Sequence, residues 1–186
     1  LAVIPARGGS KRIENKNLLP LAGKPLINWT IKAGLASKYI DKVIVSSDSD
    51  AICMAAINAG AEVPFLRPDE LAGDYSSSSD VVLHAVEFLR SKKEHFDICI
   101  LLQPTSPLRV AAHIDEAIES FDKLNAKAVI SVTHVTHPVE WINELGEIGE
   151  MDKFFVDNAI SKRSQDFVQR FAVNGALYIF DVPSFL

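Results

Sequence analysis

The sequence has few of the features that mark secreted, membrane-spanning or nucleic-acid-binding proteins. It contains only two cysteines in 186 residues, Cys53 and Cys99, and both lie among apolar neighbours. This excludes a disulfide framework, and we expect two buried, reduced thiols in a cytoplasmic protein. No apolar run approaches the roughly 18 residues of a membrane-spanning helix, and no stretch resembles a signal peptide. We therefore expect no membrane partner.

The sequence also lacks a surplus of positive charge. The formal net charge is -5, with 48% hydrophobic and 23% charged residues. The negative balance argues against a nucleic-acid partner, and the composition excludes intrinsic disorder. Residues 6–17 depart from this balance, because they include two arginines, two lysines and a single acid, Glu14. A segment this basic beside an apolar strand raises the possibility of an anionic ligand.

Apolar runs typical of strands alternate with segments that have the periodicity of amphipathic helices. This alternation predicts one α/β domain over residues 1–186, with a mostly parallel, doubly wound, Rossmann-like sheet flanked by helices. Residues 61–66 form a further short, β-like segment. The expected strands are 1–5, 42–47, 96–103, 127–135 and 174–182, and the expected helices are 23–38, 48–60, 80–93 and 111–125.

Residues 137–169 break this rhythm. They contain Trp141, the pair Phe154 and Phe155, and mixed charges without a clear period. We interpret the segment as an excursion from the core sheet and a candidate arm for packing on a second subunit.

The loop after the first strand, "ARGGSKR", is the strongest candidate for binding phosphate. Two glycines allow the backbone to point successive N–H groups at an anion, and Arg7, Lys11, Arg12 and Lys16 add cationic donors for a triphosphate. The spacing fits neither a Walker loop nor G-x-G-x-x-G. Without the glycine fingerprint, a nicotinamide-dependent oxidoreductase loses its main support. The alternative to phosphate binding is a solvated basic loop in which the glycines are structural.

Two further loops follow predicted strands or precede helices. In "LLQPTSPLR" the prolines stiffen the exit from a buried strand, so that Gln103, Thr105 and Ser106 reach its rim; turn formation alone would also explain them. In "FLRPDELAGDYSSSS", Arg67 could contact a base carbonyl or a phosphate. The serine run could contact a base or cap the following helix, and we expect Ser78 or Ser79 to be that cap.

Other kinds of catalytic site have little support. His134 and His137 are three residues apart, which favours a metal only weakly, and no cluster has zinc-ligand spacing. No G-x-S-x-G elbow is present, so covalent catalysis has no support from the sequence. Asp48, after the second strand, could either ligate a metal or cap the helix that starts there.

Several of these segments together resemble one enzyme family. The stretches "IPARGGSKRIENKNLLPLAGKPLINWTI", "VIVSSDS", "GAEVPFLRPDELAGD", "LLQPTSPLR" and "NGALYI", with "HP" at 137–138, are similar in sequence and order to the acylneuraminate cytidylyltransferases. The resemblance implies a nucleotide-diphospho-sugar transferase type of fold. It also implies a reaction in which CTP and a nine-carbon 2-keto-3-deoxy sugar acid give a CMP-sugar and pyrophosphate.

The resemblance further implies a homodimer with shared active sites, a dimerisation role for residues 137–169, and magnesium (Mg²⁺) as cofactor. The family's paired metal-binding aspartates belong to a strand that this sequence does not reach, so the expected ligands lie beyond Leu186. Carried over by position, the catalytic residues would be Lys16 and Arg7, the nucleotide-binding residues Arg7, Gly8, Gly9, Ser10, Lys16, Asn17, Arg67 and Ser77, and the sugar-binding residues Gln103, Thr105, Arg163, Asn174 and Tyr178.

Two departures from the family pattern bear on the sugar. Ser164 stands where the family usually has an arginine, so Arg163 or Lys162 must pair with the sugar carboxylate. Glu140 stands where some sialic-acid enzymes have a basic residue. N-acetylneuraminate is the expected acceptor; legionaminate, pseudaminate and a non-catalytic nucleotide-binding module are the alternatives. An acidic D-x-D strand after Leu186 would favour the enzyme over the module.

Overall fold

The computed structural model describes residues 1–10, 13–73, 75–151, 154–155 and 161–186. The chain divides into two units. The first unit combines Leu1–Ile130 with Gly175–Leu186, and the second unit is Ser131–Asn174. The second unit thus contains the segment that breaks the strand–helix rhythm of the sequence.

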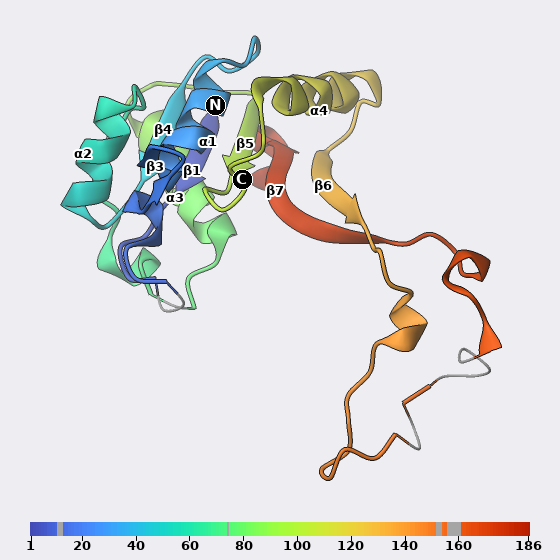
Figure 1. The fold of residues 1–186 in the computed structure, drawn as a ribbon. Helices are drawn as coiled ribbons and strands as arrows, with labels where there is room; N and C mark the ends of the chain where they lie inside the picture. Colours follow the sequence, from blue (N-terminus) through green and yellow to red (C-terminus); the bar gives the residue numbers. More distant parts are fainter. Residues whose placement is uncertain (11–12, 74, 152–153, 156–160) are drawn as a thin grey trace. The chain divides into compact units, whose positions relative to one another are not determined.

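The first strand lies inside a five-stranded sheet with the order β4-β1-β5-β7-β6 (Figure 1). β1 pairs in parallel with β4 on one side and with β5 on the other, whereas β7 pairs with β5 in antiparallel fashion. The predicted α/β fold with a mostly parallel core is confirmed. The strands are β1 Ala2–Pro5, β4 Val43–Ser46, β5 Ile98–Leu102, β6 Ala128–His134 and β7 Phe171–Asp181.

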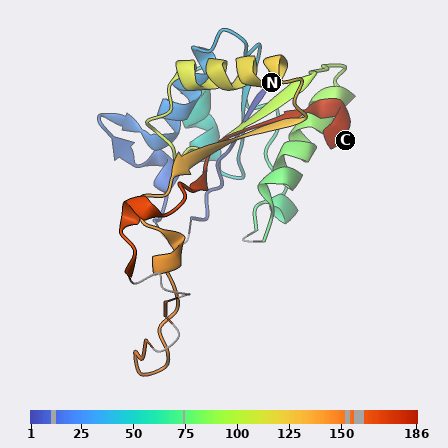
Figure 2. The ribbon, with the colours of Figure 1, turned by 90° about the vertical axis from the view of Figure 1, so that its right-hand side faces the viewer.

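Helices cover both faces of this sheet because successive strand side chains point to opposite sides. Ala2 and Ile4 of β1 pack with α1, α2 and α4, while Val3 packs with α3 and α5. Figure 2 shows α4 and α3 on opposite sides of the sheet. The helices are α1 Leu26–Leu35, α2 Asp50–Asn58, α3 Ser78–Ser91, α4 Ala111–Lys123 and α5 Val182–Phe185.

Short elements connect these layers in the first unit and shape the second. A two-stranded hairpin of β2 Pro20–Leu21 and β3 Lys24–Pro25 precedes α1. Single 3-10 turns lie in the loops: η1 Lys16–Leu18, η2 Asp69–Leu71, η3 Val139–Trp141 and η5 Ser164–Asp166.

The short strand expected at 61–66 is reduced to one isolated bridge. Glu62 pairs with Ile44, and its N–H donates to the Val43 carbonyl at 2.9 Å. Pro64 lacks an N–H and cannot extend this pairing. The expectation of a strand over residues 61–66 was therefore wrong, because only Glu62 pairs with the sheet.

The cap of α3 is also shifted relative to the expectation of Ser78 or Ser79. Ser77 is the N-cap: its Oγ accepts from the Asp80 N–H at 3.1 Å, and the Asp80 carboxylate accepts from the Ser77 N–H. Only Ser77 has Asp80 three residues ahead, which is the spacing of a reciprocal capping box. The acid thus selects one serine from the run.

The two cysteines are free and buried, as expected. Burial raises the pKa of Cys99 to about 12, so its thiol stays protonated near neutral pH. In the described part of the chain, no helix is long and apolar enough to cross a membrane.

The second unit is held by contacts between its two ends. The Val135 N–H donates to the Arg170 carbonyl at 2.9 Å, and the His134 and Phe171 rings lie 4.7 Å apart. Arg170 also pairs with the Glu140 carboxylate at 2.7 Å. His134 is therefore engaged in ring packing.

We expect Leu89→Ala to destabilise the first unit by about 2–5 kcal/mol, because it opens a cavity in a packed core. Leu89 is 1% exposed in the cluster between α3 and the sheet. Urea unfolding measures the loss. The matched control is Leu124→Ala at a site that is 71% exposed, for which we expect a change within about 0.5 kcal/mol. Equal losses in both variants would contradict this assignment of the core.

Candidate functional site

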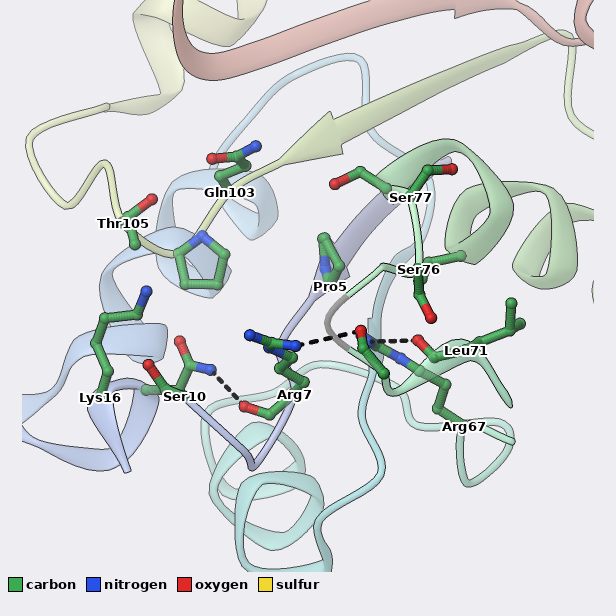
Figure 3. A pocket seen from close by; sticks show the side chains of 15 residues that line it. Pro5, Arg7, Ser10, Lys16, Arg67, Leu71, Ser76, Ser77, Gln103 and Thr105 are labelled. Carbon is green, nitrogen blue, oxygen red and sulfur yellow. Dashed lines mark hydrogen bonds between the residues drawn. The ribbon is translucent and has the colours of Figure 1, made fainter. Parts of the chain in front are cut away.

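The candidate site lies where the parallel strands β1, β4 and β5 end. Ligands of open α/β sheets bind outside the carboxyl ends of the strands, and a cavity of about 260 Å³ lies there (Figure 3). Its wall comes from the loops after β1 and β5 and from the chain between Arg67 and α3. The lining residues are Pro5, Arg7, Ser10, Lys16, Asn17, Arg67, Leu71, Gly73, Ser76, Ser77, Ser78, Val81, Gln103, Pro104 and Thr105.

The cavity brings together most of the residues predicted to bind nucleotide. Of the residues in that prediction, Gly8 and Gly9 do not line it. Lys11 and Arg12, which the sequence also singled out, lie outside the described residues. The predicted nucleotide-binding residues that do line the cavity are Arg7, Ser10, Lys16, Asn17, Arg67 and Ser77.

Gly8 fixes the path of the first loop. Its N–H donates to Asp48 Oδ1 at 2.9 Å, and a Cβ at Gly8 would lie 3.1 Å from Ser49 Cβ. The backbone therefore approaches α2 more closely than a larger residue would allow comfortably. Ser49 is the N-cap residue of α2, and no side-chain hydrogen bond caps this helix. Asp48 therefore does not cap it. The capping alternative for Asp48 was thus wrong, and the carboxylate holds the basic loop instead.

Two side chains of the first loop hold it from inside. Asn17 is 5% exposed, and its Nδ2 donates to the Arg7 carbonyl at 3.2 Å. The Arg7 guanidinium crosses to the Gly73 carbonyl, 3.2 Å away. Lys16 opens the turn η1 and directs its ammonium end toward the loop that carries Thr105 (Figure 3). Two half-buried cations, Arg7 and Lys16, therefore face one cavity.

Arg67 is more deeply buried than a simple ligand-binding arginine, at 5% exposure. Its Nε donates to Ser46 Oγ at 3.0 Å, its Nη2 to the Ser46 carbonyl and its Nη1 to the Leu71 carbonyl at 3.5 Å. Burial lowers the pKa of Arg67, and the Asp48 carboxylate opposes that shift. The guanidinium thus joins the end of β4 to the turn η2, while part of it still lines the cavity.

Ser77 combines two roles in one hydroxyl. Its Oγ accepts the capping hydrogen bond from Asp80 at the start of α3, yet the residue lines the cavity. Because the cap uses the oxygen as acceptor, the O–H can still donate to a ligand.

Gln103 lies at the boundary between two cavities. It lines the first one together with Thr105, and it lines a second, largely apolar cavity of about 300 Å³ together with Tyr178. Gln103 follows β5 directly, and Tyr178 is on the neighbouring strand β7. Three of the residues predicted to bind sugar therefore lie around one pair of adjoining cavities. The second cavity is lined by Ser78, Ser79, Val82, Leu101, Gln103, Tyr178, Phe180 and Phe185.

The other two predicted sugar-binding residues belong to the second unit. Arg163 donates from Nε and Nη2 to the two carboxylate oxygens of Asp166, at 3.1 and 3.0 Å. This contact lowers the pKa of Asp166. The Asn174 Oδ1 accepts from Ser131 Oγ at 2.7 Å.

Sequence reasoning missed Arg109, the last residue of "PTSPLR". It is 6% exposed and donates to the carbonyls of Gln103 and Ala176 and to Thr30 Oγ1. Burial lowers the pKa of Arg109 to about 10, so the guanidinium remains charged at pH 7. The sequence signal that could have indicated Arg109 is a single arginine in the proline-containing loop that follows the buried strand β5.

The described residues contain no cluster of metal-ligating side chains. Among them, no group of three or more histidine, cysteine, aspartate or glutamate side chains could hold a metal ion. Asp48, the acid considered for this role, already accepts from Gly8 with one of its oxygens.

The fold and the cavity together define an α/β nucleotidyltransferase type of site, with a basic loop after the first strand and polar groups at the ends of its neighbours. Residues 1–169 match the family model described as Cytidylyltransferase, and the chain belongs to that family. It is accordingly a nucleotidyltransferase, and the resemblance identified from the sequence motifs is confirmed.

Curated relatives carry several related names. The chain is 36% identical over 96% of its length to a pseudaminic acid cytidylyltransferase of Campylobacter jejuni, of which it covers 76%. It is 37% identical over its whole length to an N-acylneuraminate cytidylyltransferase of Escherichia coli, of which it covers 43%. A CMP-N,N'-diacetyllegionaminic acid synthase of Legionella pneumophila is 45% identical over 72% of the chain, which covers 57% of that relative.

A solved structure supports the fold. The chain superposes along its whole length on a CMP:2-keto-3-deoxy-manno-octonic acid synthetase complexed with CTP, covering 75% of that chain with a TM-score of 0.71 and 21% identity. At this identity the likeness shows the common fold alone.

We expect Arg67→Ala to destabilise the first unit, because the Ser46 oxygens lose their buried donors. A buried group left unsatisfied costs about 1–3 kcal/mol. The free energy of unfolding in urea measures the loss. Arg90→Ala is the control, since Arg90 is exposed on α3 and should change stability by less than about 0.5 kcal/mol. If both variants were equally stable, Arg67 would not be a structural clamp.

Proposed function

We propose that the protein transfers a cytidylyl group from CTP to a nonulosonic acid, releasing pyrophosphate and forming a CMP-sugar. The observation that supports this most is the placement of Gln103, which lines both the basic cavity and the adjoining apolar one. A nucleotide in the first cavity and a sugar acid in the second would meet at this residue. The relatives named for pseudaminic, N-acylneuraminic and diacetyllegionaminic acids support the same class of reaction.

The first cavity is the proposed CTP site. Arg7, Ser10 and Lys16 bind the triphosphate, since guanidinium, hydroxyl and ammonium donors suit phosphate oxygens. Gly8 contributes by keeping the loop close to the start of α2, and Gly9 is proposed to contribute through its backbone N–H, which suits a phosphate oxygen. The cytosine and ribose lie toward Asn17, Arg67 and Ser77, which also line this cavity.

The reaction needs positioning and charge neutralisation more than covalent help. The anomeric 2-hydroxyl of the acid attacks the α-phosphorus of CTP in line with the departing pyrophosphate. The bond between the α-phosphorus and the oxygen that bridges to the β-phosphate breaks, the hydroxyl proton passes to water, and negative charge grows on the departing pyrophosphate. Lys16, assisted by Arg7, stabilises that charge.

The acceptor lies in the second cavity against Gln103 and Tyr178, and it reaches toward Thr105, which lines the adjoining first cavity. Arg163, from the excursion that a partner subunit would supply, pairs with the acceptor carboxylate, and Asn174 of β7 is a further proposed contact to the sugar. N-acetylneuraminate is the proposed acceptor, and legionaminate and pseudaminate are the alternatives. A non-catalytic nucleotide-binding module is the remaining alternative.

The surface of the second unit supports the proposal of a homodimer. Large apolar side chains are exposed along it, as at an interface that a second copy covers. They are Val132, Val139, Ile142, Leu145, Ile148, Met151, Phe155, Val168, Phe171 and Val173.

Mg²⁺ is proposed as a cofactor that arrives with CTP, whose phosphate oxygens are the hard ligands that this ion prefers. When bound, it would neutralise part of the triphosphate charge. The buried reduced cysteines support a cytoplasmic setting for the reaction.

Lys16→Ala tests the proposed chemistry. We expect kcat to fall about 100-fold or more, because a donor to the developing charge is lost, while the KM for CTP changes by only a few fold. Steady-state pyrophosphate release measures both constants. Lys24→Ala is the control, since Lys24 lies over the Trp29 ring in the β2–β3 hairpin region and should leave kcat unchanged. A loss confined to CTP binding would remove Lys16 from the chemical step.

Gln103→Ala tests the division of the two cavities. We expect the KM for the sugar acid to rise about tenfold, equivalent to about 1.4 kcal/mol of binding, with the KM for CTP almost unchanged. Initial rates with each substrate varied separately measure the two constants. Equal effects on both substrates would contradict the assignment of Gln103 to the acceptor.

A further inference from the structure

We propose that Arg109 and Gly175 are positioning residues that set the orientation of the Gln103 carboxamide, and through it the recognition of the acceptor. This inference rests on the proposed function, in which Gln103 contacts the sugar acid. Neither residue lines the candidate cavities. Arg109 contacts the Gln103 backbone, and Gly175 contacts the Gln103 side chain.

Arg109 holds the backbone of Gln103. Its Nη1 donates to the Gln103 carbonyl at 3.3 Å and also to the Ala176 carbonyl on β7. Its Nη2 donates to Thr30 Oγ1 on α1 at 2.8 Å, and the Thr30 hydroxyl lies 3.4 Å from the same Gln103 carbonyl. One guanidinium therefore joins the end of β5 to β7 and α1 at the residue that faces the acceptor.

Gly175 supports the side chain of the same glutamine. A Cβ at Gly175 would lie 3.1 Å from Gln103 Oε1, 3.5 Å from Cδ and 3.7 Å from Nε2. The carboxamide thus lies directly against the Gly175 backbone, which has a φ of +73°. The next residue, Ala176, gives its carbonyl to Arg109. The surface under the side chain and the anchor of its backbone are therefore adjacent on β7.

The chemistry of Arg109 favours positioning over general stability. Among the described residues no carboxylate pairs with this buried cation, and its Nε has no hydrogen-bond partner there. A buried, unpaired charge is an expensive way to hold a core together. The planar fork of an arginine can bind separate carbonyls in fixed directions, which a lysine cannot reproduce. A requirement to hold the Gln103 backbone in one orientation would explain why a buried arginine occupies this position.

The test is a double-mutant cycle in the full-length enzyme. Arg109→Lys and Gly175→Ala are each combined with Gln103→Ala, and the KM values for the sugar acid and for CTP are measured separately. We expect each single change to raise the KM for the acid about fivefold and to leave that for CTP within about twofold. In the Gln103→Ala background the further change should vanish, because residues that act through one another are not additive.

Asp115→Asn is the control for a purely structural effect. Asp115 is 7% exposed, and its Oδ1 accepts from Ser37 Oγ at 2.6 Å and from the Lys38 N–H at 3.1 Å, which links α4 to the chain after α1. This variant should lower stability without moving either KM. Thr30→Val, nearly the same shape, replaces Arg109→Lys if the latter does not fold, and should raise the acceptor KM in the same direction.

The outcomes separate the two proposals. If Gln103→Ala raises the KM for the acid but Arg109→Lys and Gly175→Ala behave like Asp115→Asn, the positioning role is overturned and the proposed function stands. Additive effects in the cycle would also overturn it. If Gln103→Ala itself leaves the KM for the acid unchanged, the assignment of Gln103 fails and the positioning role falls with it.

Discussion

The buried hydrogen bonds from Arg67 to Ser46 are the constraint on which the site depends. Parallel strands bring their carboxyl ends to one edge, but they do not by themselves close a cavity there. Arg67 fastens the chain that leads to α3 onto the end of β4, and Asp48, just after β4, fastens the first loop through Gly8. Two separate stretches of chain thus meet at one strand, and the basic cavity lies between them.

The arginines and lysine around this edge divide into two kinds. Arg67 and Arg109 are nearly inaccessible and use their donors on protein carbonyls and hydroxyls. Arg7 and Lys16 are half-buried and face the cavity. The buried pair shapes the site, and the accessible pair is left to meet negative charge. This division suits a reaction in which positioning and charge compensation carry the catalysis.

Much of the fold could be predicted from the sequence because it depends on local patterns. The strands around Val3, Ile44 and Ile100 are short apolar runs, and the helices between them have one apolar side. The basic loop and the Gln103 loop could also be found, because both follow those strands directly.

The remaining features depend on pairings across the fold. The serine run gives several equivalent cap candidates, and only the hydrogen bond from Asp80 selects Ser77. Arg67 could be predicted as a nucleotide-binding candidate, but its buried hydrogen bonds to Ser46 could not, because Ser46 is distant from it in the sequence. Arg109 could not be assigned because its partners, Thr30 and Ala176, come from opposite ends of the chain.

The most direct measurement is pyrophosphate release by the full-length protein with CTP and Mg²⁺. N-acetylneuraminate, diacetyllegionaminate, pseudaminate and 2-keto-3-deoxy-manno-octonate are each supplied as acceptor, with a control that has none. We expect release that requires an acceptor, rapid with one of the three nine-carbon acids and slow with the eight-carbon acid. No release with any of the four, from a protein that still binds CTP, would contradict the proposed reaction.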